Sequence, residues 1–326
     1  LFRSKRIPKK FITVSNAIKN NLKNITVDFP LHVFCTIVGV SGSGKSSLLF
    51  YEFYAMIKKF LLINSAATKR ATDIKNIVMI DQKPIGKTIR SNVATYTGIF
   101  DKIRKLFAQA PLSKKRGYTE SNFSFNTYQG KCKKCCGKGA QTVSMYLLPD
   151  IVTDCTACKG TGFCLPTLEV TYKDKNIAQV LDMTIEQAYV FFEHHVWISE
   201  KLSYLLAVGL SYITLGQSSS TFSGGESQRI KLADELSFKN SGYIYIFDEP
   251  TTGLHFVDIQ KLLKAFDMLV DQGNSLFVVE HNIDVIRYSD YVIELGPEGG
   301  NNGGYIIAKG SPEEIKINEK TGFDFI

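Results

Sequence analysis

One eight-residue stretch constrains the fold of this chain more than any other. Gly39 to Ser46 fits the pattern G-x-x-x-x-G-K-[S/T] at every fixed position. An apolar, β-branched run, Leu31–Val38, precedes it, and a predicted helix, Ser47–Lys58, follows it. Glycines let the backbone turn successive N–H groups toward phosphates, and the helix adds its positive end. The sequence therefore predicts a nucleotide site in an α/β fold.

Within this loop we assign a role to each fixed residue. Lys45 would reach the β- and γ-phosphates, and the Ser46 hydroxyl would ligate magnesium. The residues expected to bind the nucleotide are Gly39, Ser41, Gly42, Gly44, Lys45, Ser46 and Ser47. A glycine loop without a ligand is the alternative, but it gives no reason for a lysine and a serine at these places.

Two carboxylates end a second predicted strand. Tyr243–Phe247 is apolar and runs directly into Asp248 and Glu249. Asp248 would hold magnesium, and Glu249 would polarise the attacking water. An ordinary acidic loop is the alternative. A third strand, Ser275–Val279, leads to His281, which could contact a γ-phosphate or be structural. A predicted helix, His255–Leu269, lies between the two strands, so strands and helices alternate here as in an α/β core.

The cysteines form a second constellation. Cys132-x-x-Cys135 and Cys155-x-x-Cys158 are separated by 19 residues, and each pair is followed by two glycines. Two such knuckles can supply four thiolates to one tetrahedral zinc ion, so we expect a structural zinc module. A redox role is the alternative. Cys136 and Cys164 fall outside the pattern and are interpreted as spare thiols, although Cys136 adjoins a ligand and could compete.

Charge is unevenly distributed along the chain. The net charge is +8, but residues 1–23 carry seven basic residues and no acid, and residues 101–140 carry ten basic residues and two acids. The rest of the chain nets −7. Two basic blocks suggest a polyanionic partner, with a solvated surface as the alternative. Four lysines, Lys131, Lys133, Lys134 and Lys138, surround the first cysteine knuckle and are our candidate contacts to the phosphate backbone of a nucleic acid.

Several classes of protein are excluded. No run of 18 apolar residues exists, so we expect no membrane-spanning helix, and the basic N-terminus has no apolar core of a secretory signal. Seven cysteines, an odd number, in such a chain indicate a reducing compartment, so we expect a cytoplasmic protein. The chain begins with Leu1 and not Met, which favours a fragment of a longer protein. We find no internal repeat.

The stretch Thr221–Arg229 decides between ATPase families. Its Ser-Gly-Gly before a helix is a second helix N-terminus able to face phosphate. Phe222–Glu226 resembles the signature motif of ABC-type ATPases, in which Leu is usual where Phe222 stands. Asp248-Glu249 resembles their Walker B pair, His281 their switch histidine and Gln82 their Q-loop glutamine.

The ABC-type resemblance implies further nucleotide contacts and a second module. The implied contacts are Ser223, Gly224, Gly225 and Glu226, together with the catalytic residues Glu249, His281 and Gln82. In that family the signature of one module closes over the phosphate loop of another. One phosphate loop and one signature therefore imply a second copy or a missing half.

An ABC-type ATPase with a four-cysteine module between Q-loop and signature resembles the family of the damage-sensing component of the bacterial excinuclease (UvrA), in its C-terminal ATPase half. The stretches that carry this resemblance are Gly39–Ser47, Ile80–Gly86, Arg90–Phe100, Gly117–Cys135, Leu147–Asp150, Ala178–Thr184, Gly209–Leu232, Tyr243–Asp258 and Glu280–Gly300. They imply an ATP-binding core at 1–90 and 241–326, and a signature domain at 91–240 with a zinc module at 128–168.

The family implies a dimeric, DNA-binding ATPase of nucleotide excision repair and the SOS response, with ATP, magnesium and zinc as cofactors. Such a protein recognises damaged duplex DNA and passes it to the second excinuclease component (UvrB), which docks on the family's other half. Two alternatives stay open: a UvrA-like ATPase with a drug-resistance role, and a non-hydrolysing DNA-binding scaffold.

Overall fold

The computed structural model describes residues 4–63, 74–86, 88, 90–145 and 148–316, so Arg3 and Leu147 lie outside the described residues. The chain divides into two compact units. Unit 1 takes Leu1–Gln82, Ala207–Gly209 and Lys231–Ile326, and unit 2 takes Lys83–Leu206 and Leu210–Ile230. The boundaries expected from the sequence, after residues 90 and 240, differ from these by several residues, and the return of Ala207–Gly209 to unit 1 was not expected.

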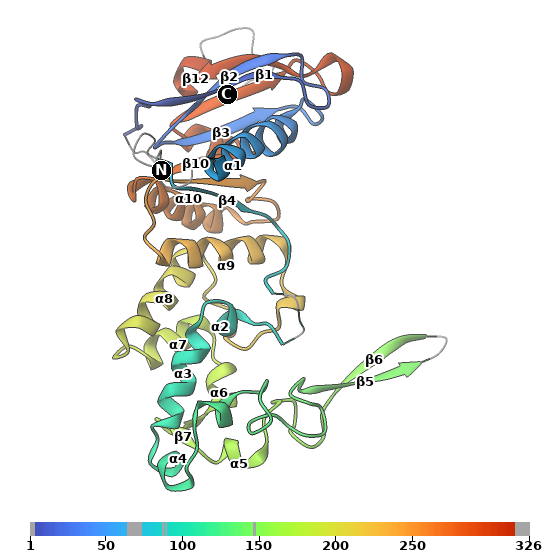
Figure 1. Ribbon diagram of the computed structural model, residues 1–326, viewed down its shortest axis with the longest axis vertical. Helices are drawn as coiled ribbons and strands as arrows, with labels where there is room; N and C mark the ends of the chain where they lie inside the picture. Colours follow the sequence, from blue (N-terminus) through green and yellow to red (C-terminus); the bar gives the residue numbers. More distant parts are fainter. Residues whose placement is uncertain (1–3, 64–73, 87, 89, 146–147, 317–326) are drawn as a thin grey trace. The chain divides into compact units, whose positions relative to one another are not determined.

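A six-stranded sheet forms the centre of unit 1 (Figure 1). Its strands, in spatial order, are β12 (Tyr305–Gly310), β11 (Tyr291–Gly296), β3 (Phe34–Gly39), β10 (Ser275–Val279), β9 (Tyr243–Asp248) and β4 (Asn76–Ile80). All are parallel except β12, which runs antiparallel to β11. Every residue of β3 and β10 is buried, as expected for inner parallel strands covered on both faces.

Parallel pairing brings the functional strand ends together. β10 pairs with β3 on one side and β9 on the other, so the carboxyl ends of these three strands meet at one edge of the sheet. The phosphate loop follows β3, Asp248 ends β9 and His281 follows β10. This edge is where parallel α/β sheets hold their ligands.

Further elements complete unit 1. They are the antiparallel pair β1 (Phe11–Ala17) and β2 (Ile25–Pro30), and the helical segments η1 (Ser47–Phe53), α1 (Tyr54–Ile63), α10 (Phe256–Asp271), α11 (Ile283–Tyr288), η4 (Gly300–Asn302) and α12 (Pro312–Lys316). The helix expected at Ser47–Lys58 begins at Ser47, but its first seven residues are π-helical and the helix runs on to Ile63. The helix expected at His255–Leu269 is α10.

Three phenylalanines form the aromatic centre of the unit 1 core. The Phe29 ring stacks on Phe53 with centroids 4.0 Å apart, and Phe277 meets both rings edge-on at 5.4 and 5.0 Å. All three side chains are fully buried. Burying each contributes about 1.5–3 kcal/mol. The cluster joins β2, η1 and β10, and thereby supports the helical segment that follows the phosphate loop.

Unit 2 is built from short helices, and the hairpin of β5 and β6 projects away from them (Figure 1). Its elements are α2 (Val93–Tyr96), α3 (Ile99–Ala108), α4 (Pro111–Arg116), η2 (Glu120–Phe123), β5 (Ala140–Met145), β6 (Leu148–Asp154), α5 (Leu165–Leu168), β7 (Thr171–Tyr172), β8 (Lys175–Asn176), α6 (Ile177–Leu181), α7 (Ile185–Phe191), α8 (Val196–Ala207) and η3 (Ser219–Thr221). α9 (Gly224–Ser237) begins in unit 2 and ends in unit 1.

Aromatic contacts join α3 to the cysteine region. Phe125 stacks on Phe100 of α3 at 5.0 Å and meets Phe163, which follows the second knuckle, at 5.6 Å. The segment 184–210 forms two helices, α7 and α8, with a break between Phe191 and Val196. Among the residues that the structure describes, no helix combines the length and apolar character that a membrane span requires.

Candidate nucleotide and metal sites

The phosphate loop leaves β3 through backbone conformations that favour glycine. Gly39, Gly42 and Gly44 have φ of 143°, 78° and 105°. A Cβ on Gly39 would lie 2.1 Å from the carbonyl oxygen of Leu295 in the neighbouring strand β11, which no side chain tolerates. The glycines at these positions are therefore required by the path of the chain.

Lys45 lies across the loop that precedes it. Its Nζ donates hydrogen bonds to the carbonyl oxygens of Gly39 and Val40 at 2.8 and 2.9 Å, and only 7% of the residue is exposed. Burial lowers the pKa of Lys45 from its ordinary value, and the nearby carboxylates of Glu249 and Asp248 oppose that shift. The ammonium group thus lies within the field of the two carboxylates at the end of β9.

Most of the predicted loop residues share one cavity with two of the predicted catalytic residues. The cavity measures about 200 Å³ and is lined by Asn21, Ser41, Gly42, Gly44, Lys45, Ser46, Ser47, Glu249, Val279 and His281. His281 Nε2 lies 3.3 Å from Glu249 Oε1. Gln82, at the end of unit 1, is exposed and does not line this cavity.

The two carboxylates at the end of β9, Asp248 and Glu249, differ in their surroundings. Burial raises the pKa of Asp248, the charge of Glu249 raises it further, and Lys45 acts in the opposite direction. Glu249 has φ of 42°, a left-handed conformation that is uncommon outside glycine, and its N–H donates to the carbonyl of Val279 at 3.0 Å. That bond ties the end of β9 to the end of β10.

Glu280 is a residue of this site that the sequence motifs did not predict. It is 2% exposed, and both its carboxylate oxygens accept main-chain hydrogen bonds. Oε1 accepts from Thr251 N at 2.9 Å, and Oε2 accepts from His281 N at 2.9 Å and Asn282 N at 3.1 Å. One buried carboxylate therefore organises the loop after Glu249 and the loop that carries His281. Its position between an apolar strand and the histidine was the available signal.

The signature segment begins α9 with a reciprocal cap. Ser223 N donates to Glu226 Oε2 at 2.8 Å, and Glu226 N donates to Ser223 Oγ at 3.2 Å. The Tyr212 hydroxyl donates to the other carboxylate oxygen at 2.7 Å. Burial would raise the pKa of Glu226, but the donors of Tyr212 and Ser223 hold it below its ordinary value. Glu226 thus stabilises the helix N-terminus that exposes Ser223.

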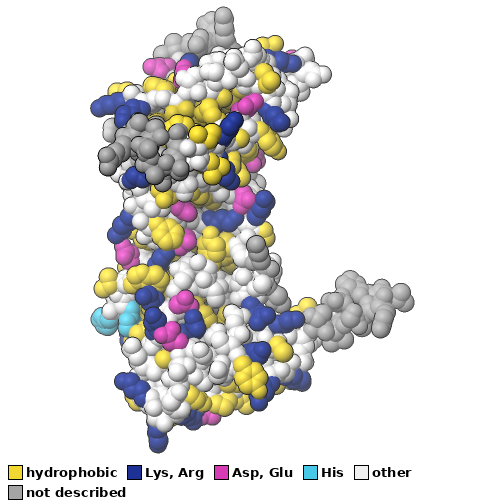
Figure 2. Space-filling view, in the orientation of Figure 1, with side chains coloured by type: hydrophobic (Ala, Val, Ile, Leu, Met, Phe, Trp, Pro, Cys, Tyr) yellow, Lys and Arg dark blue, Asp and Glu magenta, His cyan; other side chains and the backbone are white. Residues whose placement is uncertain are grey.

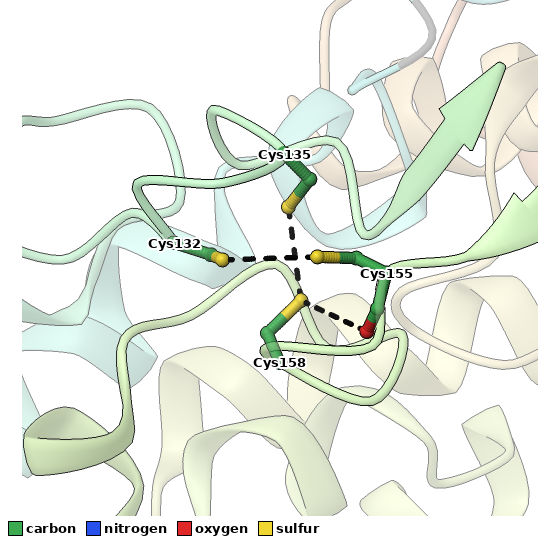
Figure 3. Close-up of side chains that lie close together, drawn as sticks. All are labelled: Cys132, Cys135, Cys155 and Cys158. Atoms are coloured by element: carbon green, nitrogen blue, oxygen red, sulfur yellow. Dashed lines mark hydrogen bonds between the residues drawn. The ribbon is translucent and has the colours of Figure 1, made fainter.

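The four predicted zinc ligands point toward a common centre (Figure 3). Their sulfur atoms all lie within 4.8 Å of one another, with 3.9 Å between Cys132 and Cys155 and 3.7 Å between Cys135 and Cys158. Tetrahedral zinc with Zn–S distances of about 2.3 Å places its sulfurs about 3.8 Å apart. Four buried thiols at this spacing fit a zinc ion. Cys136 is exposed and outside the cluster.

The two knuckles are related by a local pseudo-two-fold. Cys132 N donates to the carbonyl of Gly162, and Cys155 N donates to the carbonyl of Gly139, both at 2.8 Å. Gly139 N and Gly162 N each donate to the second cysteine sulfur of their own knuckle at 3.3 Å. The chain therefore does contain a short internal repeat, C-x-x-C-x-G-x-G, and the expectation of no repeat was wrong at this length.

The donors around Cys155 favour its thiolate, whereas burial raises the pKa of Cys158 in the same knuckle. Burial would raise the pKa of Cys155, but the main-chain N–H groups of Cys158 and Ala157 lower it to about 7. Since the thiolate is the form that binds metal, the lowered pKa of Cys155 suits a metal ligand.

The candidate DNA-contacting lysines are unequally placed. Lys133, Lys134 and Lys138 are exposed, whereas Lys131 is half-buried. Lys134 Nζ donates to Thr156 Oγ1 of the second knuckle at 2.8 Å. Lys and Arg side chains gather near the base of the β5–β6 hairpin on the face shown in Figure 2.

A cavity beside the knuckles adds two cations that the sequence motifs did not single out. It measures about 360 Å³, and Lys138 lines it together with Arg90 and Lys159. The glycines of both knuckles contribute backbone to its wall. The cavity lies between the knuckles and the segment around Asn92 within unit 2.

The N-terminal basic block is partly engaged within unit 1. Arg6 forms ion pairs with Asp267 at 2.9 Å, Asp271 at 2.6 Å and Asp290 at 3.2 Å. Lys5 Nζ donates to the carbonyls of Arg287 and Ser289. Two of the seven basic residues in this block therefore fasten the chain to α10 and α11.

Comparison with known proteins assigns the family. A family model described as ABC transporter matches residues 22–252. This chain belongs to the ABC transporter family. The expected ABC-type α/β fold is thereby confirmed, and the four-cysteine cluster is compatible with the expected zinc module.

Among members of the ABC transporter family, the resemblance to UvrA is also confirmed. UvrABC system protein A of Aquifex aeolicus (strain VF5) is 50% identical over 316 residues, which cover 95% of this chain and 34% of that protein. Its namesake from Streptococcus pneumoniae serotype 4 (strain TIGR4) is 50% identical over 317 residues, with the same coverage. The crystal structure of UvrA2 from Deinococcus radiodurans superposes with a TM-score of 0.89 at 42% identity, covering 98% of this chain and 39% of that one. The chain thus spans about a third of the length of these curated relatives.

Proposed function

We propose that this chain is the C-terminal ATPase half of a UvrA-type protein of nucleotide excision repair. In this proposal it binds DNA, recognises damaged duplex and couples ATP binding and hydrolysis to the loading of UvrB. The observation that carries the proposal is the convergence of Lys45, Glu249 and His281 on one cavity at the carboxyl edge of an ABC-type sheet. The names of the curated relatives support the repair assignment.

The residues of the nucleotide site have separate roles in ATP hydrolysis. Lys45 binds the β- and γ-phosphates, and the N–H groups of the phosphate loop surround them. Glu249 orients the attacking water, and His281, 3.3 Å away, completes the contact to the γ-phosphate. Gln82, which does not line the cavity, contacts the same phosphate once a second module has closed over the site. Ser46 and Asp248 would hold magnesium, which would neutralise the charge that develops on the phosphate.

A complete site needs a second module. Here Ser223, Gly224 and Gly225 present the N-terminus of α9, which favours an anion. We propose that this signature closes over the phosphate loop of the other module, either an N-terminal half or another copy. The cap formed by Glu226 prepares the helix end for this contact.

The cysteine module serves as a rigid DNA-facing element. Zinc, bound by Cys132, Cys135, Cys155 and Cys158, would be structural because four protein ligands leave no open position. It would fix the exposed Lys133, Lys134 and Lys138 beside a cavity that also presents Arg90 and Lys159. Such a surface suits backbone contacts, which damage recognition requires because lesions occur in many sequences.

DNA-stimulated ATP hydrolysis by the full-length protein tests this function. We expect Lys45→Ala to weaken nucleotide binding and Glu249→Gln to keep binding while hydrolysis falls by about a hundredfold or more. Ser289→Ala, a remote position in unit 1, serves as the control for general destabilisation. Hydrolysis by Glu249→Gln at the wild-type rate would exclude the assigned chemistry, and DNA binding with no hydrolysis in the wild type would indicate a scaffold.

A further inference from the structure

A glycine-rich connection lies against the phosphate loop without belonging to it. The segment Gly299–Gly304 reads G-G-N-N-G-G and lies in the connection between β11 and β12. It comes more than 250 residues after the phosphate loop in the sequence. None of the nucleotide-site motifs identified in the sequence assigns it a role.

Main-chain hydrogen bonds join this segment to two carbonyls of the phosphate loop. Gly300 N donates to Gly42 O at 3.0 Å, and Gly304 N donates to Ser43 O at 3.1 Å. The side-chain amide of Asn21 closes the arrangement, since its Nδ2 donates to Gly42 O at 2.8 Å and to Gly300 O at 3.2 Å. The loop is thus held from outside at two successive peptide units.

Holding these carbonyls fixes the direction of an N–H group. The peptide unit is planar and trans, so the N–H of Gly44 points away from the Ser43 carbonyl. Gly44 lines the cavity that Lys45 and Glu249 also line. The hydrogen bond from Gly304 to Ser43 therefore orients one of the N–H groups that would face a phosphate.

The approach is close enough to exclude any side chain. A Cβ on Gly299 would lie 2.5 Å from the carbonyl oxygen of Ser41, and a Cβ on Gly304 would lie 2.0 Å from the carbonyl oxygen of Asn21. Both neighbours are backbone atoms, which cannot turn aside as a flexible side chain could. An added methyl group at Gly299 must displace the phosphate loop or the segment itself.

We propose that Gly299–Gly304, together with Asn21, is a clasp that preorganises the phosphate loop of this module for nucleotide. The clasp is a positioning element: it sets nucleotide affinity through the loop and touches no reacting atom. It makes the affinity of the site depend on the β11–β12 connection, far from the loop in the sequence. This inference rests on the proposed function, because it requires that the cavity bind a nucleotide.

Nucleotide affinity in matched variants tests the clasp. The dissociation constant of a fluorescent ADP analogue with magnesium is measured in the full-length protein, with any second phosphate loop silenced by a lysine-to-alanine change. We expect Gly299→Ala and Asn21→Ala each to weaken binding by about tenfold or more, which corresponds to about 1.4 kcal/mol per factor of ten. Asn21→Ala removes the donor to both carbonyls without adding a charge to the cavity.

Gly273→Ala is the matched control. Gly273 also has a left-handed φ, 88°, and a Cβ there would make only an ordinary contact, 3.7 Å from Ser241 Cβ, away from the clasp. It should lower the thermal midpoint while leaving affinity within about twofold, because it costs only local backbone strain.

Each outcome separates the hypotheses. Wild-type affinity in both Gly299→Ala and Asn21→Ala overturns the clasp, and so does an equal loss in Gly273→Ala. If Gly299→Ala fails to fold, Asn21→Ala decides. Absence of nucleotide binding by the wild type refutes the proposed function and is seen before any variant is compared.

Discussion

The buried carboxylate of Glu280 accepts a hydrogen bond from the main-chain N–H of Thr251 at 2.9 Å, across 29 residues of sequence. The same carboxylate accepts from His281 N and Asn282 N. The loops that follow β9 and β10 are therefore held by one side chain. Since these loops carry Glu249 and His281, their relative position depends on Glu280.

We predict that Glu280→Gln reduces turnover more than it reduces ATP affinity. The amide nitrogen cannot accept, so at least one buried N–H loses its partner, at a cost of about 1–3 kcal/mol. Steady-state kinetics should show kcat falling about tenfold with KM nearly unchanged. Glu52→Gln is the control, because Glu52 Oε1 also accepts two main-chain N–H groups, from Ile18 and Lys19. A similar loss in both variants would contradict a positioning role.

Asp248 should show a conflict between stability and function. Burial and the charge of Glu249 raise its pKa, so the ionised form disfavours the folded state. That penalty is absent below the ordinary carboxyl pKa and grows as pH rises toward the raised folded value. Asp248→Asn should therefore raise the thermal midpoint at neutral pH, without magnesium or nucleotide, while hydrolysis is lost. A lower midpoint in this variant would count against the penalty.

Metal content tests the cysteine cluster. Replacing Cys132 or Cys158 by serine should reduce bound zinc from about one ion per chain to background, because each supplies one of four thiolates. Cys136→Ser is the matched control, since this exposed cysteine adjoins Cys135 and lies outside the cluster. A chelator should expose residues 131–165 to proteolysis before the ATPase core. Equal zinc in all three variants would exclude the assigned ligand set.

DNA affinity should depend steeply on salt. Charge reversal at Lys133, which is exposed beside the first knuckle, should weaken DNA binding and lower the slope of log K against log salt by about 1. Lys264→Glu, on the exposed face of α10, is the control. Filter binding across a salt series makes the measurement. An unchanged slope in Lys133→Glu would remove this lysine from the DNA surface.

Arg6 should behave as a structural residue and not as a DNA contact. Its side chain is 24% exposed and pairs with three aspartates, of which the Asp290 side chain is fully buried. Arg6→Ala should lower the free energy of unfolding by about 1–3 kcal/mol, less than a fully buried pair would, because water screens the exposed part. Urea unfolding measures the loss. Weaker DNA binding at unchanged stability would reverse this assignment.

The strands and the site motifs could be predicted from the local pattern of the sequence. Ser275–Val279 is the predicted strand with the same bounds in the structure, because an inner parallel strand is apolar throughout. The phosphate loop and the cysteine cluster follow from fixed spacings, which the fold preserves. The π-helical turn of η1 was not predictable, since its side-chain spacing differs little from that of an α-helix over seven residues.

Contacts between residues far apart in the chain could not be predicted from the sequence pattern. The aspartates that hold Arg6 lie 261–284 residues away, and Thr251 meets Glu280 only after β9 and β10 have paired. The basic N-terminal block is therefore compatible, from sequence alone, with a linker or a DNA contact, although two of its residues serve the fold. Likewise, the return of Ala207–Gly209 to unit 1 depends on tertiary contacts that no local signal encodes.

The main-chain hydrogen bonds between the two knuckles also connect the cysteine cluster to the β5–β6 hairpin. Ala140 pairs with Asp154 at the base of the β5–β6 hairpin, and the next bond along the ladder is the one from Cys155 to Gly139. The hairpin ladder thus continues directly into the cysteine cluster. The direction in which the hairpin leaves its base is therefore set by the same main-chain hydrogen bonds that position the two knuckles.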